Sequence, residues 1–160
     1  MIRVCFVCLG NICRSPTAEG VMKRLVRDAD LAHAIETESA GTAGYHVGET
    51  PDPRSREEAM RRGVQLESRA QQFQAHHFPR FDYVLAMDGE NFADLKRLTD
   101  DAAHHARLYL LRHFEPGDSK ERNVPDPYYG GDDGFAHVFE ICEAACRGLL
   151  DHIVEQHALR

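Results

Sequence analysis

The hydrophobic residues of the chain fall into short continuous runs that alternate with stripes of helical spacing. Residues 2–8 form the first run, which is apolar and rich in β-branched side chains, and this pattern predicts a buried strand. A helical stripe follows, with Ser15 as the expected N-cap and Pro16 at the first helical position. The stripe consists of Val21, Met22, Leu25 and Val26. Residues 8–15 are therefore predicted to form a loop between a strand and a helix.

The same alternation continues along the rest of the chain. The pattern predicts further strands over 35–42, 81–88 and 106–111 and further helices over 53–62, 90–98 and 134–157. Asp52 is expected to cap the second helix, with Pro53 at its first position and Gly63 as its stop. The apolar face of the last helix consists of Phe135, Val138, Phe139, Cys142, Ala145, Cys146, Leu149, Leu150 and Ile153. Strands that alternate with helices predict an α/β fold with a parallel sheet covered on both sides.

Two segments lie where a ligand is expected. In a sheet of this class, ligands bind beyond the carboxyl ends of the strands, and the loop 8–15 follows the first strand directly. Residues 114–134 form the longest turn-rich stretch, and a loop of that length in a small domain is usually functional or disordered. Both segments are candidates for the site.

Composition limits the functional classes. A chain of 160 residues is expected to form one domain, residues 1–160. The net charge of −7 disfavours nucleic acid or an anionic membrane as a partner. The five cysteines, an odd number, favour a reducing compartment. With neither a signal-like segment nor an apolar run near the roughly 20 residues of a spanning helix, a cytoplasmic location is expected.

The loop 8–15 carries groups that suit a phosphate. Successive backbone N–H groups that run into a helix N-terminus can form an anion-binding nest, and Gly10 and Asn11 tolerate the left-handed conformation that such a nest needs. Arg14 can bind two phosphate oxygens at once. The same positive field favours the thiolate of Cys8, which could then attack phosphorus and form a cysteinyl-phosphate. This chemistry predicts no metal and no cofactor.

The attack also needs an acid for the leaving group. Asp126 lies in the turn-rich segment between Pro125 and Pro127, which stiffen its backbone, and is the expected general acid and base. Because the acid must carry a proton, we expect the rate to be highest on the acid side of neutrality. Asp88, after the third strand, is expected either to cap the next helix or to orient Asp126.

The C-x5-R-S loop at 8–15, together with SAGT at 39–42, AMD at 86–88 and DPYYGG at 126–131, closely resembles the low-molecular-weight protein tyrosine phosphatase family over nearly the whole chain. The resemblance implies a three-layer, doubly wound, four-stranded parallel sheet of flavodoxin-like order. It also implies a metal-independent phosphatase that acts on phosphotyrosine in proteins. An autophosphorylated tyrosine kinase is a candidate partner.

The resemblance implies a role for each matching residue. Cys8 is the expected nucleophile, Arg14 the transition-state binder and Asp126 the general acid and base. The phosphate-binding and supporting residues implied are Leu9, Gly10, Asn11, Ile12, Cys13, Ser15 and Ser39. The substrate walls implied are Leu9, Ile12, Tyr45, Tyr128 and Tyr129.

A polar network is also implied behind the loop. Ser15 matches a serine that bonds to the thiolate, and Asn11 and Ser39 match a left-handed asparagine and its partner. The family's network also uses a histidine, where this chain has Ser68, so the candidates for its place are Ser68 itself, His46 or a water.

Two other functions stay open. Related arginine phosphatases carry Thr at the position of Ile12, so Ile12 favours phosphotyrosine, with arginine phosphatase as the alternative. A non-catalytic module that binds anions or senses redox state through Cys8 and Cys13 is the alternative from another class. Cys13 is either an ordinary loop residue or a redox backup that forms a reversible disulfide with Cys8.

Overall fold

The computed structural model describes residues 1–131 and 133–159, and its sheet has four parallel strands in the order β2-β1-β3-β4. The strands are β1 (Ile2–Cys8), β2 (Ile35–Gly41), β3 (Tyr83–Ala86) and β4 (Leu108–Leu110). This topology confirms the predicted α/β fold and its flavodoxin-like order. The connections that leave β1 and β3 run to opposite sides of the sheet, so the switch point lies between these two strands, and the loop after β1 starts there.

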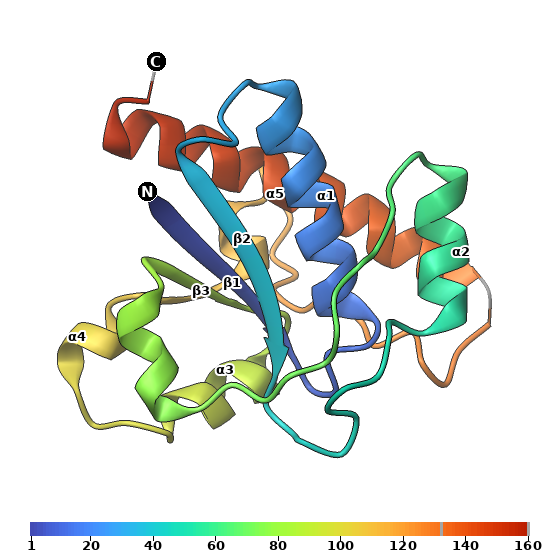
Figure 1. The fold of residues 1–160 in the computed structure, drawn as a ribbon, viewed down its shortest axis with the longest axis horizontal. Coiled ribbons are helices and arrows are strands. Elements are labelled where there is room, and N and C mark those ends of the chain that lie inside the picture. The colour runs from blue at the N-terminus through green and yellow to red at the C-terminus, as the bar shows by residue number, and fades with distance from the viewer. Residues whose placement is uncertain (132, 160) are drawn as a thin grey trace.

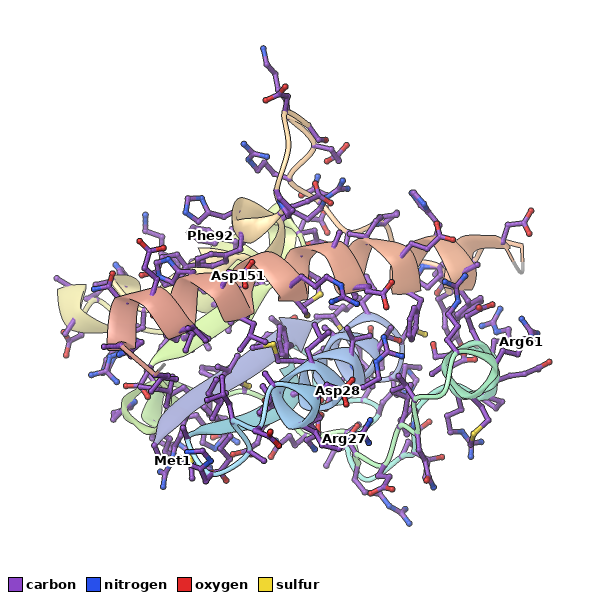
Figure 2. All side chains as sticks on the ribbon, turned by 90° about the horizontal axis from the view of Figure 1, so that it is seen from above. Met1, Arg27, Asp28, Arg61, Phe92 and Asp151 are labelled. Carbon is purple, nitrogen blue, oxygen red and sulfur yellow. The ribbon has the colours of Figure 1, made fainter. Side chains whose placement is uncertain are left out.

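Helices cover both faces of the sheet, as the alternating pattern predicts. They are α1 (Arg14–Asp28), α2 (Pro53–Arg61), α3 (Gly89–Lys96), α4 (Ala102–His105) and α5 (Asp133–His157), with 3-10 helices η1 (Ala75–Arg80) and η2 (Leu111–Phe114). Helices α1 and α5 lie side by side on one face, and α3 and α4 lie on the other (Figure 1). Figure 2 shows exposed charged residues on the outer surfaces of these helices, such as Asp151 on α5 and Arg27 on α1. No helix among the described residues is long and apolar enough to cross a membrane.

Strand β1 supplies side chains to two separate hydrophobic clusters. Val4 and Phe6 lie in the larger cluster with α1 and α5, and Cys5 and Val7 lie in the cluster on the opposite face. All four side chains are fully buried. A strand buried on both faces explains the continuous apolar run at 2–8.

The predicted helix boundaries were partly wrong. Helix α1 begins at Arg14 with Cys13 as its N-cap, and Ser15 is not the cap because its hydroxyl lies 3.0 Å from the Cys8 sulfur instead. Asp52 caps α2, with Pro53 at the first position, as predicted. The apolar face of α5 is buried throughout, which confirms that prediction.

Short elements were missed and long ones overextended. The 3-10 helices and α4 were not predicted, because a single turn is too short to show a period. Strands β3 and β4 are shorter than the apolar runs 81–88 and 106–111 that predicted them. Residues 115–131 contain neither helix nor strand, in agreement with the predicted long loop.

Candidate active site

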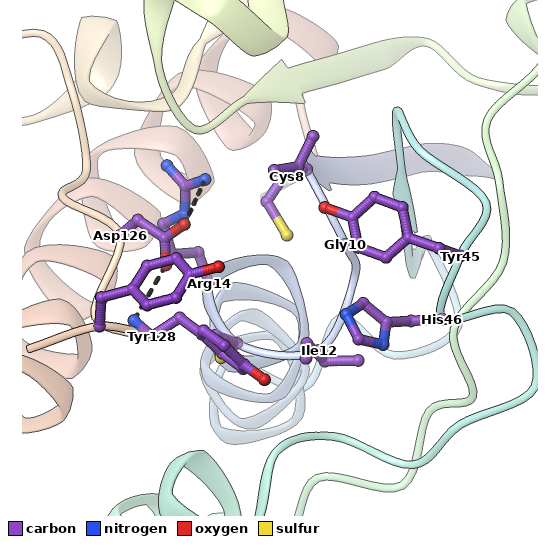
Figure 3. A pocket seen from close by; sticks show the side chains of 11 residues that line it. Cys8, Gly10, Ile12, Arg14, Tyr45, His46, Asp126 and Tyr128 are labelled. Carbon is purple, nitrogen blue, oxygen red and sulfur yellow. Dashed lines mark hydrogen bonds and ion pairs between the residues drawn. The ribbon is translucent and has the colours of Figure 1, made fainter.

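A pocket of about 230 Å³ lies beyond the carboxyl end of β1, against the N-terminus of α1. In Figure 3 the Cys8 sulfur lies between Arg14, Asp126 and Tyr128 on one side and Tyr45 and His46 on the other. The residues that line the pocket are Cys8, Leu9, Gly10, Ile12, Cys13, Arg14, Tyr45, His46, Asp126, Tyr128 and Tyr129. The structure thus brings together the predicted nucleophile, cation, acid and walls. His46 was not predicted as a wall residue.

Hydrogen bonds converge on the buried sulfur of Cys8. The backbone N–H of Asn11 donates to it at 3.3 Å, and the Ser15 hydroxyl lies 3.0 Å away. Helix α1 begins within the same loop, so its positive N-terminal end also faces this region. Two hydrogen-bonding groups and the N-terminal end of a helix therefore surround one sulfur.

The end of β2 supports the loop from below. Gly41 pairs with Cys8 across the sheet, and a Cβ atom at Gly41 would lie 2.7 Å from the carbonyl oxygen of Leu9. The next two residues extend the contact, because the backbone N–H groups of Thr42 and Ala43 donate to the carbonyl oxygens of Cys8 and Leu9 at 2.9 Å. The loop therefore lies directly on backbone, with no side chain between them.

Asn11 stands at the centre of a buried network. Its φ of 58° is left-handed, as predicted, and its side-chain Nδ2 donates to the hydroxyls of Ser15 at 2.8 Å and Ser39 at 3.0 Å. Its Oδ1 accepts the backbone N–H of Gln71 at 3.0 Å. The Ser39 hydroxyl donates to the carboxylate of Glu19. Because Ser15 accepts from Asn11, its own proton has two acceptors in reach, the Cys8 sulfur at 3.0 Å and the carbonyl oxygen of Ala40 at 3.4 Å, of which the sulfur is the nearer.

The expectation that His46 takes the place of the family's histidine was wrong. Among the described residues, neither Ser68 nor His46 bonds to Asn11, and His46 instead binds Glu49 through Nδ1 at 2.8 Å. Glu19 terminates the network through Ser39.

Sequence reasoning missed Glu19. Its side chain is buried, and its second oxygen pairs with Lys23 one turn further along α1. The signal was a charged residue inside the apolar stripe, on the helix face that Ser15 and Met22 share. Because a buried charge needs partners, its position pointed to a polar network.

Arg14 is held by two groups from other segments. Its Nη1 donates to Asp88 at 2.6 Å and to the carbonyl oxygen of Val124 at 3.0 Å. Burial acts to lower the pKa of the guanidinium, but the neighbouring Cys8 and Asp88 outweigh burial and raise it. The other oxygen of Asp88 caps α3 at the N–H of Asn91. The predicted capping role of Asp88 is confirmed, and its second contact orients Arg14 rather than Asp126.

The segment that carries Asp126 makes fewer contacts. The Asp126 side chain is 41% exposed, lies 3.8 Å from Arg14 Nη2 and accepts the backbone N–H of Tyr128 at 3.0 Å. The rings of Tyr128 and Tyr129 meet edge to face at 4.9 Å, but Tyr129 is 92% exposed. Tyr45 opposite is 65% exposed. The aromatic walls therefore stand largely in solvent around the buried sulfur.

Cys13 is buried in a small cluster of its own. It packs with Ile12, Ala70 and Phe135, and burial raises the pKa of its thiol to about 12. This thiol is therefore protonated near neutral pH. The ordinary structural role has direct support, and the redox role stays a prediction.

The comparisons with known proteins agree with this geometry. Residues 3–159 match the family model described as low molecular weight phosphotyrosine protein phosphatase. The chain is 47% identical to a low molecular weight protein-tyrosine-phosphatase of Streptomyces coelicolor, over 96% of this chain and 94% of that protein. It is 40% identical to a low molecular weight phosphotyrosine protein phosphatase of Homo sapiens, over 92% and 93% of the two chains. A crystal structure of a protein tyrosine phosphatase from Entamoeba histolytica, with Hepes in its active site, superposes with a TM-score of 0.93 at 38% identity, covering 98% of this chain and 99% of that one.

Proposed function

Because the chain belongs to the low molecular weight phosphotyrosine protein phosphatase family and is a protein-tyrosine phosphatase, we propose that Cys8, Arg14 and Asp126 carry out its reaction. The observation that carries the proposal is the Cys8 sulfur, which receives an N–H from its own loop and lies in one pocket with Arg14 and Asp126. Nucleophile, charge stabiliser and acid are then present within a single site.

In the first step the Cys8 thiolate attacks the phosphorus of phosphotyrosine. A sulfur–phosphorus bond forms while the phosphorus–oxygen bond to the tyrosine breaks, and the leaving phenolate takes its proton from Asp126. Arg14, held in place by Asp88, and the N–H groups of the loop bind the non-bridging oxygens. The step leaves a cysteinyl-phosphate and a free tyrosine side chain.

In the second step water attacks the cysteinyl-phosphate. Asp126, now ionised, accepts a proton from that water as the new phosphorus–oxygen bond forms and the phosphorus–sulfur bond breaks. The products are inorganic phosphate and the regenerated thiolate. The Ser15 hydroxyl, 3.0 Å from the sulfur, stabilises the thiolate as it leaves.

The residues that would contact the substrate support phosphotyrosine in proteins as the substrate. Leu9 and Ile12 provide apolar contact below, and the exposed rings of Tyr45 and Tyr128 stand on opposite sides of the opening (Figure 3). An aromatic ring between such walls gains both burial and edge contacts. The fit favours a phosphotyrosyl side chain over phosphoarginine, whose guanidinium would bring a positive charge against the apolar Ile12.

We further propose one phosphatase domain over residues 1–160, located in the cytoplasm. All five cysteines are free thiols, which supports a reducing compartment. An autophosphorylated tyrosine kinase fits as a source of substrate, and the net charge of −7 supports neither nucleic acid nor a membrane as a partner.

Turnover of p-nitrophenyl phosphate in EDTA tests the proposal. The parent should retain full activity with the chelator, Cys8→Ser should abolish turnover, and Cys13→Ser, a matched change in the same loop, should keep it. Acid-quenched parent enzyme should carry one phosphoryl group on Cys8 by mass spectrometry. Equal turnover by Cys8→Ser would refute the assignment of the nucleophile.

A second comparison tests the substrate class. The parent should hydrolyse phosphotyrosyl peptides faster than phosphoarginyl peptides, and Ile12→Thr should narrow that ratio. A parent that prefers phosphoarginine would establish the arginine phosphatase alternative. A parent inactive on both, yet still able to bind phosphate, would support the non-catalytic alternative.

A further inference from the structure

Arg54, in the first turn of α2, contacts two aromatic rings from other parts of the chain. Its guanidinium carbon lies 5.3 Å from the ring centre of Tyr128 and 4.7 Å from that of Phe135, at the start of α5. Asp52 holds the same group by two bonds, from Nε to Oδ1 at 3.1 Å and from Nη2 to Oδ2 at 3.0 Å. The planar cation is therefore fixed in both position and orientation.

The residues on both sides of Arg54, Asp52 and Tyr128, are hydrogen-bonded to parts of the active site. On one side, the backbone N–H of Asp52 donates to the carbonyl oxygen of Ile12, in the phosphate loop, at 2.7 Å. On the other side, the backbone N–H of Tyr128 donates to the Asp126 carboxylate at 3.0 Å. Arg54 thus lies between the phosphate loop and the segment that carries the acid.

The acid segment, residues 115–131, has few other anchors near Tyr128. Its buried residues are Val124, whose N–H donates to the carbonyl oxygen of Met87 at 2.7 Å, and Pro127. After Val124 the backbone hydrogen bonds among the described residues of the segment are local, such as that from the Gly130 N–H to the Pro127 carbonyl oxygen. Beyond Pro127, the contact of Tyr128 with Arg54 joins the exposed aromatic end of the segment to α2.

We propose that Arg54 is a positioning residue that holds Tyr128, and through it places the Asp126 carboxyl group against the leaving oxygen. The proposal rests on the function proposed above. Arginine suits the role because its flat guanidinium stacks on a ring while its edge still binds a carboxylate, whereas lysine offers a compact charge without that geometry. Direct recognition of an acidic substrate side chain is a weaker explanation, because Asp52 already neutralises Arg54.

The dependence of kcat/KM on the leaving group tests this role. This parameter reports transfer to Cys8, in which a poor leaving group such as the phenolate of phenyl phosphate needs the acid far more than p-nitrophenolate does. Because a misplacement of 1 Å can cost up to about 10²-fold, Arg54→Ala should lose about tenfold on phenyl phosphate and about twofold on p-nitrophenyl phosphate. Arg54→Lys should fall between the parent and Arg54→Ala.

Arg62 provides a matched control. It follows α2 directly, its guanidinium carbon lies 5.0 Å from the ring centre of Phe139 on α5, and it pairs with Glu58 and Glu140. It therefore makes the same kind of contact between α2 and α5, away from the acid segment. Arg62→Ala should leave the leaving-group dependence unchanged.

Each outcome is decisive. A steeper leaving-group dependence for Arg54→Ala alone, absent when Asp126→Ala is already present, supports the proposal. A parallel loss on both substrates, or the same steepening in Arg62→Ala, overturns it in favour of general packing. If Arg54→Ala does not fold, Arg54→Lys and Tyr128→Leu must each steepen the dependence for the proposal to stand. An inactive parent would overturn the proposed function itself, which is a separate result.

Discussion

The phosphate loop 8–15 and the acid segment 115–131 face the same pocket but are built in opposite ways. The loop is mostly buried, with Leu9 exposed, lies on the backbone of Gly41 and is held through Asn11 by a network of side-chain hydrogen bonds. The segment is mostly exposed, and its acid is 41% exposed. The charge of the transition state is stabilised by donors that are already in place. The segment that carries the proton donor must in addition let the substrate enter and the product leave. The two constructions match these two tasks.

This contrast predicts that mutations in the two regions separate activity from stability. Changes in the exposed segment should reduce catalysis and leave the fold intact. Changes behind the loop should reduce both, because the network that places the catalytic groups is also part of the buried core.

Asp126→Ala should have the largest effect on catalysis. We expect kcat/KM for a phosphotyrosyl peptide to fall by about 10² to 10⁴-fold, because the leaving group loses its acid. The free energy of unfolding should change by less than about 0.5 kcal/mol, because the side chain is half exposed. Asp118→Ala, an exposed change in the same segment, should affect neither property, and equal losses in both variants would contradict the role of Asp126.

Asn11→Ala should reduce both properties. The change leaves the partners of Asn11 unbonded and places alanine at a left-handed φ of 58°, so we expect a loss of about 3 kcal/mol in stability and up to about 10²-fold in kcat/KM. Urea unfolding and steady-state kinetics measure the two effects. Asn11→Gly removes the same bonds without the backbone strain and should be the more stable of the two variants. Full activity in either variant would show that the network does not place the loop.

Glu19→Gln should have a smaller effect that again falls on both properties. Gln keeps the shape of the side chain but can donate to Ser39, which disturbs the order of donors that ends at Cys8. We expect a loss of about 1 to 2 kcal/mol in stability and a several-fold loss in kcat/KM. Lys23→Ala, which removes only the exposed partner of Glu19, should cost less than about 1 kcal/mol. A larger effect of Lys23→Ala than of Glu19→Gln would place the important contact at the surface.

Cys13→Ser should leave the untreated enzyme nearly unchanged and alter its response to peroxide. If Cys13 forms a disulfide with oxidised Cys8, the parent should regain activity with added thiol more completely than the variant. Because burial raises the pKa of Cys13 to about 12, we expect disulfide formation to be slow at neutral pH and faster in alkaline solution. Equal recovery of parent and variant at both pH values would reduce Cys13 to a packing residue.

Asp52→Asn should have the smallest effect on stability, and this effect should depend on pH. Burial acts to raise the pKa of Asp52, but hydrogen bonds from Arg54 outweigh it and lower the pKa. A lowered folded pKa means that ionised Asp52 stabilises the protein above the ordinary carboxyl range and that this contribution is lost as the pH falls. The difference in Tm between parent and variant should therefore shrink as the pH falls from about 5 to about 2. A constant difference would mean that capping alone accounts for the effect.

The sequence predicted the elements with strong periodicity and the residues of the pocket. The continuous run at 2–8 and the stripe of α5 each reported a buried environment directly, and Cys8, Arg14 and Asp126 do meet at one pocket. Short elements such as α4 were missed because one turn carries no period. Ser15 was misjudged as a cap because its type suits a cap and a thiolate contact equally well.

Contacts between residues far apart in the chain could not be predicted from the sequence. Arg54 and Tyr128 lie far apart in the chain, and no local sequence pattern predicts that the guanidinium of Arg54 lies over the ring of Tyr128. Glu19 gave a signal as a charge in an apolar stripe, but its partner Ser39 belongs to another element. Such pairs depend on how α1, α2 and the strands assemble, which the sequence alone left undetermined.

The absence of a side chain at Gly41 has a consequence for how this protein can vary. The backbone of the phosphate loop packs directly on the backbone of β2 at Gly41. A Cβ atom at this position would lie 2.7 Å from the Leu9 carbonyl oxygen. Substitutions in the aromatic walls or in the acid segment can change which substrate binds. Position 41 has no such freedom, because a single added carbon would push the phosphate loop away from β2 and displace its amides.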